Sequence, residues 1–205
     1  MKRELEKWSL VVAGQWNTAI LSPGWLAKEF FKEAEVKIMY PVLGGGPPVF
    51  EAAEIRVVVA GDRVAFVPLK DDLVLLNRIE SGAKHILETL RYTPVSAFGE
   101  NFHYIDDSPP RQLKDAIDRV GADKLGTQGT VLETALRRSL ELEGRRLNLT
   151  ISSGDAFRIE LNYHYDVSDA KQAAERIENT YAPNHEHGLA LLESAYELVL
   201  DEGIG

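Results

Sequence analysis

The chain contains no cysteine. This absence excludes disulfide bonds, a thiol nucleophile and thiolate metal ligands. Long apolar runs are also missing, because no stretch approaches the roughly 20 apolar residues that a membrane-spanning helix needs. Residues 1–7 are charged and lack the apolar region of a signal peptide. From these absences we expect a cytoplasmic protein that does not insert into a membrane.

Positive charge is scarce as well. The 23 Lys and Arg residues are outnumbered by 32 Asp and Glu residues, which gives a net charge of −9. An acidic chain repels phosphate backbones, and its basic pairs are short, at Arg137-Arg138 and Arg145-Arg146. We therefore expect no general nucleic-acid binding. Phosphate-loop and nucleophile-elbow motifs are absent too, so the sequence predicts no cofactor.

The residues that are present indicate an ordinary globular protein. Hydrophobic residues make up 44% and charged residues 27% of a 205-residue chain, which is long enough to bury a core. The pattern predicts an α+β fold, with an antiparallel sheet or sheets and three or four helices packed across one face. Residues 1–120 and residues 127–205 are the expected halves, and one continuous domain is the alternative.

The first half contains the clearest hairpin, at residues 54–69, where two β-branched runs flank Gly61-Asp62. A long helix with one apolar stripe should begin at Asp71 or Asp72 and end before Thr93-Pro94. The other elements expected in this half are a strand at 9–16, a helix at 22–32, a strand at 36–40, a strand at 95–105 and a short helix at 113–120.

The second half should contain three antiparallel strands, at residues 130–141, 145–152 and 156–167. A helix is the alternative for the first of these segments, because Leu132, Ala135, Leu136 and Leu140 also fit a helical spacing. Two final helices should follow, separated by Pro183, and the last should begin at about residue 187. The hairpin at 147–161 resembles the one at 55–69, since each turns on Gly-Asp and precedes a helix. This similarity has two interpretations: an internal duplication, or a common turn type used twice.

A short string occurs twice in a similar form. Asn101-Phe102-His103-Tyr104 and Asn162-Tyr163-His164-Tyr165 both lie on predicted strands. Because side chains alternate between the faces of a strand, Asn101, His103, Asn162 and His164 should lie on a polar face, opposite the aromatic residues. If the two strands are neighbours, these four side chains should converge with Glu160 and Asp166.

Such a cluster allows three interpretations. A histidine beside a carboxylate can act as a general base, so the catalytic candidates are His103, His164, Asp166 and Glu160. The same two histidines are candidate metal ligands, although no metal site is firmly predicted. Asn101 and Asn162 are candidate binding residues. The third interpretation is an ordinary polar face of an antiparallel sheet.

Two further groups of residues, a pair of histidines and three tryptophans, have a possible role in binding. Asn184-His185-Glu186-His187 places two histidines two residues apart, whereas the helical zinc motif needs a spacing of four, so we expect an exposed loop there. Trp8, Trp16 and Trp25 gather near the N-terminus. They either fill the core or leave Trp16 and Trp25 exposed as an anchor for a partner chain.

No catalytic motif with diagnostic spacing is present, so we expect a non-enzymatic module that binds a protein partner or self-associates. Exposed sheet edges and the aromatic N-terminal segment favour this interpretation. The alternatives are a metal-dependent hydrolase centred on His103 and His164, and a binder of small ligands in a groove between sheet and helices.

Overall fold

The structure, a computed structural model, describes residues 1–32, 35–41, 46–118, 125 and 129–201. One antiparallel sheet of ten strands runs through the molecule, in the order β3-β4-β5-β6-β2-β7-β10-β9-β8. The remaining strand, β1, pairs with β7 beside the end of β2. The predicted α+β class with an antiparallel sheet is confirmed.

The sheet is built from two groups of strands. The strands before the long helix α2 are β1 (Lys2–Arg3), β2 (Ser9–Gly14), β3 (Lys37–Met39), β4 (Val49–Ala52), β5 (Ile55–Val59) and β6 (Arg63–Pro68). The strands after it are β7 (Val95–Asp106), β8 (Thr134–Leu142), β9 (Arg145–Ser153) and β10 (Phe157–Asp166).

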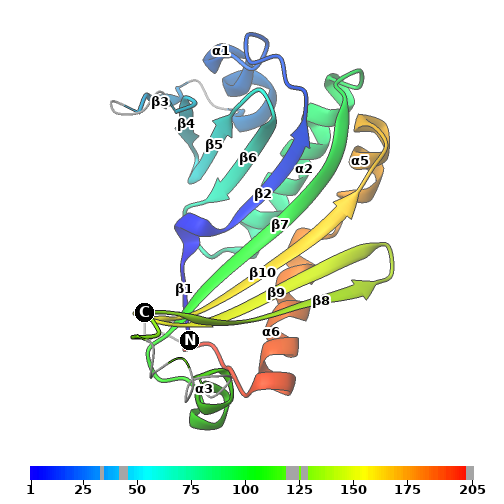
Figure 1. The fold of residues 1–205 in the computed structure, drawn as a ribbon. Helices are drawn as coiled ribbons and strands as arrows, with labels where there is room; N and C mark the ends of the chain where they lie inside the picture. Colours follow the sequence, from blue (N-terminus) through cyan, green and yellow to red (C-terminus); the bar gives the residue numbers. More distant parts are fainter. Residues whose placement is uncertain (33–34, 42–45, 119–124, 126–128, 202–205) are drawn as a thin grey trace.

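Five α-helices accompany the sheet in the described part of the chain. They are α1 (Pro23–Leu26), α2 (Leu73–Thr89), α3 (Arg111–Asp118), α5 (Ala170–Arg176) and α6 (Tyr181–Tyr196). A 3₁₀ segment, η1 (Leu5–Lys7), joins β1 to β2, and a π-helical segment, η2 (Ala27–Phe31), extends α1. Figure 1 shows α2, α5 and α6 along one face of the sheet, with α1 and α3 near opposite ends.

The strand order has the same pattern from either end of the sheet. Each of the two groups of strands, before and after α2, contributes one strand to the central pair β2–β7, and its last three strands follow outward, as β6-β5-β4 and as β10-β9-β8. A helix follows the central strand and the last strand in each group. This order is the one that a duplicated unit would produce, with β1 and β3 as additions to the first group.

The sheet is continuous across residues 1–120 and 127–205, because β7 pairs with β10. The boundary expected between residues 120 and 127 falls almost entirely outside the described residues. A division into 1–120 and 127–205 therefore stays a prediction, and the sheet itself does not stop there.

Alternation along the strands places the core between the sheet and the helices. Ile159, Leu161, Tyr163 and Tyr165 of β10 are all buried, as the sequence pattern predicts. The apolar stripe of α2 is buried against the same core through Leu76, Ile79, Ala83, Ile86 and Leu87. Asp72 caps this helix by accepting a hydrogen bond from the Val74 N–H at 2.8 Å.

The prediction of a loop at residues 184–187 is wrong. Helix α6 begins at Tyr181, so Pro183 lies in its first turn, where a missing N–H breaks no helical hydrogen bond. Glu80 of α2 accepts hydrogen bonds from the N–H groups of Asn179, Thr180 and Tyr181 at 2.6, 2.8 and 2.9 Å. A carboxylate from a distant helix thus supplies the cap that local sequence lacks.

Candidate functional site: the open face of the sheet

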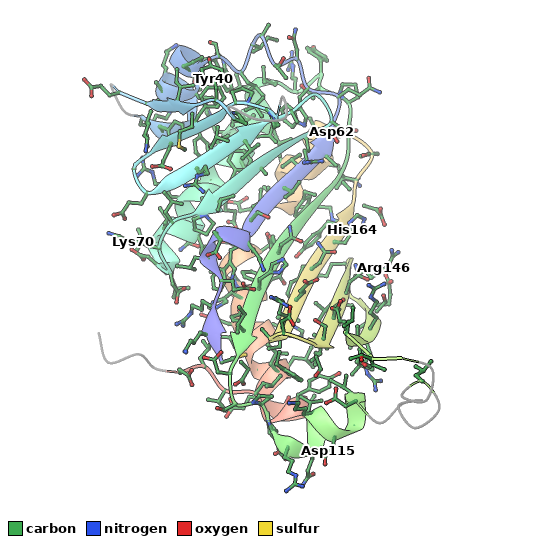
Figure 2. All side chains as sticks on the ribbon, turned by 60° about the vertical axis from the view of Figure 1, so that its left-hand side comes forward. Tyr40, Asp62, Lys70, Asp115, Arg146 and His164 are labelled. Atoms are coloured by element: carbon green, nitrogen blue, oxygen red, sulfur yellow. The ribbon has the colours of Figure 1, made fainter. Side chains whose placement is uncertain are left out.

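One face of the sheet carries no described helix, and we call it the open face. Its side chains are those that alternate with the core residues of each strand. Figure 2 shows His164 and Arg146 on this part of the sheet, and they stand opposite each other on β10 and β9. The predicted polar face is thus a real surface of the molecule.

Five side chains on the open face form a continuous hydrogen-bonded row across β8, β9, β10, β7 and β2. Ser139 Oγ donates to Asn148 Oδ1 at 2.8 Å, and Asn148 Nδ2 donates to Asn162 Oδ1 at 3.0 Å. Asn162 Nδ2 donates to Asn101 Oδ1 at 2.8 Å, and Asn101 Nδ2 donates to Ser9 Oγ at 3.1 Å. We call this set the polar row.

The polar row follows from strand register. Ser9 is opposite Asn101, Asn101 is opposite Asn162, Asn162 is opposite Asn148, and Asn148 is opposite Ser139. Direct cross-strand neighbours lie about 5 Å apart, which is within reach of an amide side chain. Each asparagine donates to one neighbour and accepts from the other, so the row fixes the orientation of its three amides without any charge.

A second feature, the apolar strip, lies two residues further along the strands. Val49 is opposite Val58, Val58 is opposite Ala65, and Val11 lies between Ala65 and Gly99. A Cβ atom on Gly99 would lie 3.2 Å from Asn162 Nδ2, so glycine leaves space for the neighbouring amide. Small side chains keep this strip flat, and its four Val and Ala residues are only half-buried.

The two histidines of the repeated string lie on neighbouring strands but do not meet. His103 is opposite Glu160, and their side chains are 3.8 Å apart. His164 is opposite Gly99, four residues from His103, so the two residues are offset by about 14 Å along the strands. The structure therefore brings Asn101 and Asn162 together and leaves the histidines on either side of the polar row.

Each histidine has its own carboxylate. Burial lowers the pKa of His103 below its ordinary value, and the nearby Glu160 opposes this effect. His164 Nε2 lies 3.0 Å from Asp166 Oδ1, and this contact lowers the pKa of Asp166. In the described ranges, no three His, Asp or Glu side chains are grouped so as to hold a metal ion.

The tryptophans belong mainly to the core. Trp8 is fully buried and its Nε1 donates to the His103 carbonyl at 2.9 Å. Trp16 is 6% exposed and donates to the Val12 carbonyl, while Trp25 is half-buried against the core. These positions leave little of Trp16 for a partner chain to contact.

The histidines of α6 take part in helix packing. His185 is 5% exposed and its ring centroid lies 4.9 Å from that of Trp8. His187 Nδ1 lies 2.7 Å from the Tyr163 hydroxyl on the core face of β10. Each histidine therefore contacts a different part of the sheet, and the two do not form a chelating pair.

A buried carboxylate, Glu100, was missed at the sequence level. It is 0% exposed and lies under α6, where Asn184 Nδ2 donates to one carboxyl oxygen at 2.6 Å and Thr180 Oγ1 lies 2.6 Å from the other. Strand alternation could have predicted its burial, because Glu100 lies between Phe98 and Phe102 on the core face of β7.

Burial raises the pKa of Glu100 to about 7, and the charge of Glu80 adds to the increase. Its two hydrogen bonds and the charge of Arg145 oppose it. Thr180 Oγ1 also lies 2.8 Å from the Ile177 carbonyl, which can only accept. Since one hydroxyl has one proton, a protonated Glu100 that donates to Thr180 satisfies all three groups.

A groove of about 750 Å³ lies between α2 and α5 on the helical side. Leu87 and Ala174 contribute apolar surface, and the Lys84–Glu178 ion pair, at 2.6 Å, joins its walls. The groove lies between helices, whereas the expected ligand groove was between sheet and helices. Its positive and negative side chains are largely paired with each other, so the lining does not indicate which class of ligand would bind there.

None of the described helices is both long and apolar enough to cross a membrane. Comparison with known proteins finds no matching family model, no matching curated protein and no matching solved structure.

Proposed function

We propose that this protein is a non-enzymatic module that binds another protein on the open face of its sheet. The observation that carries the proposal is the pairing of a half-buried apolar strip with an adjacent, fully hydrogen-bonded polar row. Interfaces combine an apolar centre with a polar rim in the same way. An uncovered sheet face that carries both is suited to recognition.

The polar row supports binding because it is already ordered. Its amides are held by neighbours on both sides, so a partner would not have to immobilise them. Loss of side-chain freedom on binding costs about 0.5–1.5 kcal/mol for each flexible side chain, and a preformed row avoids most of that loss. Its amide edges can still exchange hydrogen bonds with a polar partner surface.

The apolar strip indicates the kind of partner. Five strands at about 4.8 Å spacing make it about 19 Å long, which matches about 13 residues of an α-helix. Its small side chains allow a helix to approach the backbone closely, as α2 does against the other face. We therefore propose that the partner contributes an amphipathic helix, with its apolar side on the strip and its polar side towards Ser9 and Asn101.

The enzymatic alternative has less support. A metal-dependent hydrolase centred on His103 and His164 requires both rings at one ion, and the two residues are offset by about 14 Å along the strands. Binding of a small ligand at those histidines would need an enclosed site, and the groove of about 750 Å³ lies elsewhere, between α2 and α5.

The test uses a matched pair of variants, in each of which one alanine is replaced by arginine. Ala65 lies at the centre of the strip, and Ala190 is exposed on α6. The immobilised wild type and both variants are incubated with lysate of the cells that produce the protein, and retained proteins are quantified by mass spectrometry. We expect the Ala190→Arg variant to retain as much of the partner as the wild type does. The Ala65→Arg variant should retain at least tenfold less of it.

Thermal unfolding of both variants confirms that each is folded. The proposal fails if a folded Ala65→Arg variant retains the same proteins in the same amounts as the wild type. It also fails if the Ala190→Arg variant loses every retained protein to the same extent as the Ala65→Arg variant does, since binding would then not be specific to the open face.

A further inference from the structure

The two edges of the sheet differ sharply. One edge is β3, which has three residues and is followed closely by Pro41. The other edge is β8, which has nine residues, and no strand among the described residues pairs with its outer side (Figure 1). A strand edge presents unpaired N–H and C=O groups, so β8 is ready to pair with another strand.

The β3 edge is protected from pairing with another strand because it is short and because the nearby proline cannot donate a ladder hydrogen bond. The β8 edge has no proline and alternates apolar and charged residues, in the sequence Thr-Ala-Leu-Arg-Arg-Ser-Leu-Glu-Leu. Charges on an edge strand discourage indiscriminate pairing. They also define which partner strand fits.

The charges of β8 complement those of a second copy of β8. A two-fold axis perpendicular to the sheet keeps the open faces of both copies on one side, so residues of the same face must pair. With the axis at Ser139, Arg137 of each copy is opposite Glu141 of the other. Leu136 is then opposite Leu142 on the helical side. Cross-strand pairs of opposite charge and of apolar residues stabilise antiparallel strands.

One of the two neighbouring registers places like charges opposite each other. With the axis at Arg138, two arginines with the same charge would be directly opposite each other, which is destabilising. The favourable register also places Ser139, the last member of the polar row, beside Ser139 of the second copy. The two polar rows then meet end to end on one continuous open face.

We propose that two copies of this protein pair β8 with β8 to form an antiparallel dimer centred on Ser139. The dimer joins the two ten-stranded sheets edge to edge, much as β2 and β7 join the two groups of strands within one chain. It goes beyond the proposed partner binding and does not depend on it, because the edge and the open face are different surfaces.

A charge-swap series tests the dimer by sedimentation equilibrium over a range of concentrations. The wild type should approach twice the chain mass of 22.8 kDa. Arg137→Glu and Glu141→Arg should each weaken dimerisation at least tenfold, because each places like charges opposite one another. The double variant restores both pairs and should regain most of the affinity. Lys171→Glu, on α5, is the control and should behave as the wild type does.

The register is tested separately, since the cysteine-free chain allows a single introduced thiol. We expect Ser139→Cys to form a disulfide-linked dimer under mild oxidation at least ten times faster than Ser194→Cys, on the exposed side of α6. A wild type that remains a monomer at all concentrations overturns the proposal. So does a dimer that neither single charge reversal weakens, because its interface would lie elsewhere.

Discussion

Among single residues, Glu100 links the chemistry of the core to solution pH. Its pKa in the folded protein is about 7, whereas an unfolded glutamate has a pKa near 4.5. The folded state therefore keeps a proton that the unfolded state releases between these values. Protonation contributes stability that is fully present below about pH 4.5 and is lost as pH rises through about 7.

Substitution of Glu100 by Gln should remove this dependence. We expect wild-type unfolding free energy to fall by roughly 2 kcal/mol between pH 5 and pH 8 because of this group, since each pKa unit corresponds to about 1.4 kcal/mol. Urea unfolding at several pH values measures the slope. Glu193→Gln, at an exposed position on α6, should leave the slope unchanged. An equal slope in Glu100→Gln and wild type would show that Glu100 does not titrate in this range.

At the scale of elements, the cap of α6 connects two helices that are far apart in sequence. Glu80 accepts three N–H groups at the start of α6, and its negative charge lies at the positive end of the helix dipole. One side chain from α2 therefore caps the first turn of α6. The contact also holds Thr180 in place beside Glu100.

Glu80→Gln should loosen the first turn of α6. Glutamine keeps one acceptor oxygen and turns an amide N–H₂ towards backbone donors, so we expect a loss of about 1–3 kcal/mol in unfolding free energy. Hydrogen exchange of the Thr180 and Tyr181 amides should become faster than in Glu88→Gln, an exposed glutamate on the same helix. Unchanged exchange at both amides would refute the capping role.

Local patterns were enough to predict most elements. Alternation identified the core faces of β7 and β10, and the Asp72 cap marked the start of α2. Two short strands, β1 and β4, were missed, because a strand of two to four residues has no period of its own. The start of α6 was also missed, since its cap comes from a residue about 100 positions away.

The candidate site was predictable only in part. The alternation placed Asn101 and Asn162 on one polar face, but the contact between them depends on the register of β7 against β10. That register also separates His103 from His164, and a shift of four residues along the strand would have paired them. Register between strands about 60 residues apart is fixed by the whole core, not by a local motif.

At the scale of the whole molecule, one sheet joins both halves of the chain. The main-chain ladders β2–β7 and β7–β10 cross the centre of the molecule without interruption. The N-terminal ammonium group donates to the Val199 carbonyl at 2.7 Å, which connects the first residue to the end of the last described segment. Such continuity favours cooperative unfolding of both halves together.

Two probes can test this cooperativity. In a Trp8→Phe variant, which removes the tryptophan that contacts His185 of α6, the fluorescence of Trp16 and Trp25 reports on the first half, whereas far-ultraviolet circular dichroism reports on the whole chain. We expect both probes to give the same midpoint and slope in urea, within experimental error. Two separate midpoints would instead indicate that the halves unfold as independent domains.

We propose that the open face, and not the histidines or the helical groove, is the functional surface. The most direct test replaces Ala65 or Ala190 with a photo-crosslinking amino acid in the cells that produce the protein. After irradiation, position 65 should form an adduct with another protein through an amphipathic helical segment, and position 190 should form none. The absence of any adduct from position 65, or an adduct with a second copy of this chain alone, would contradict the claim.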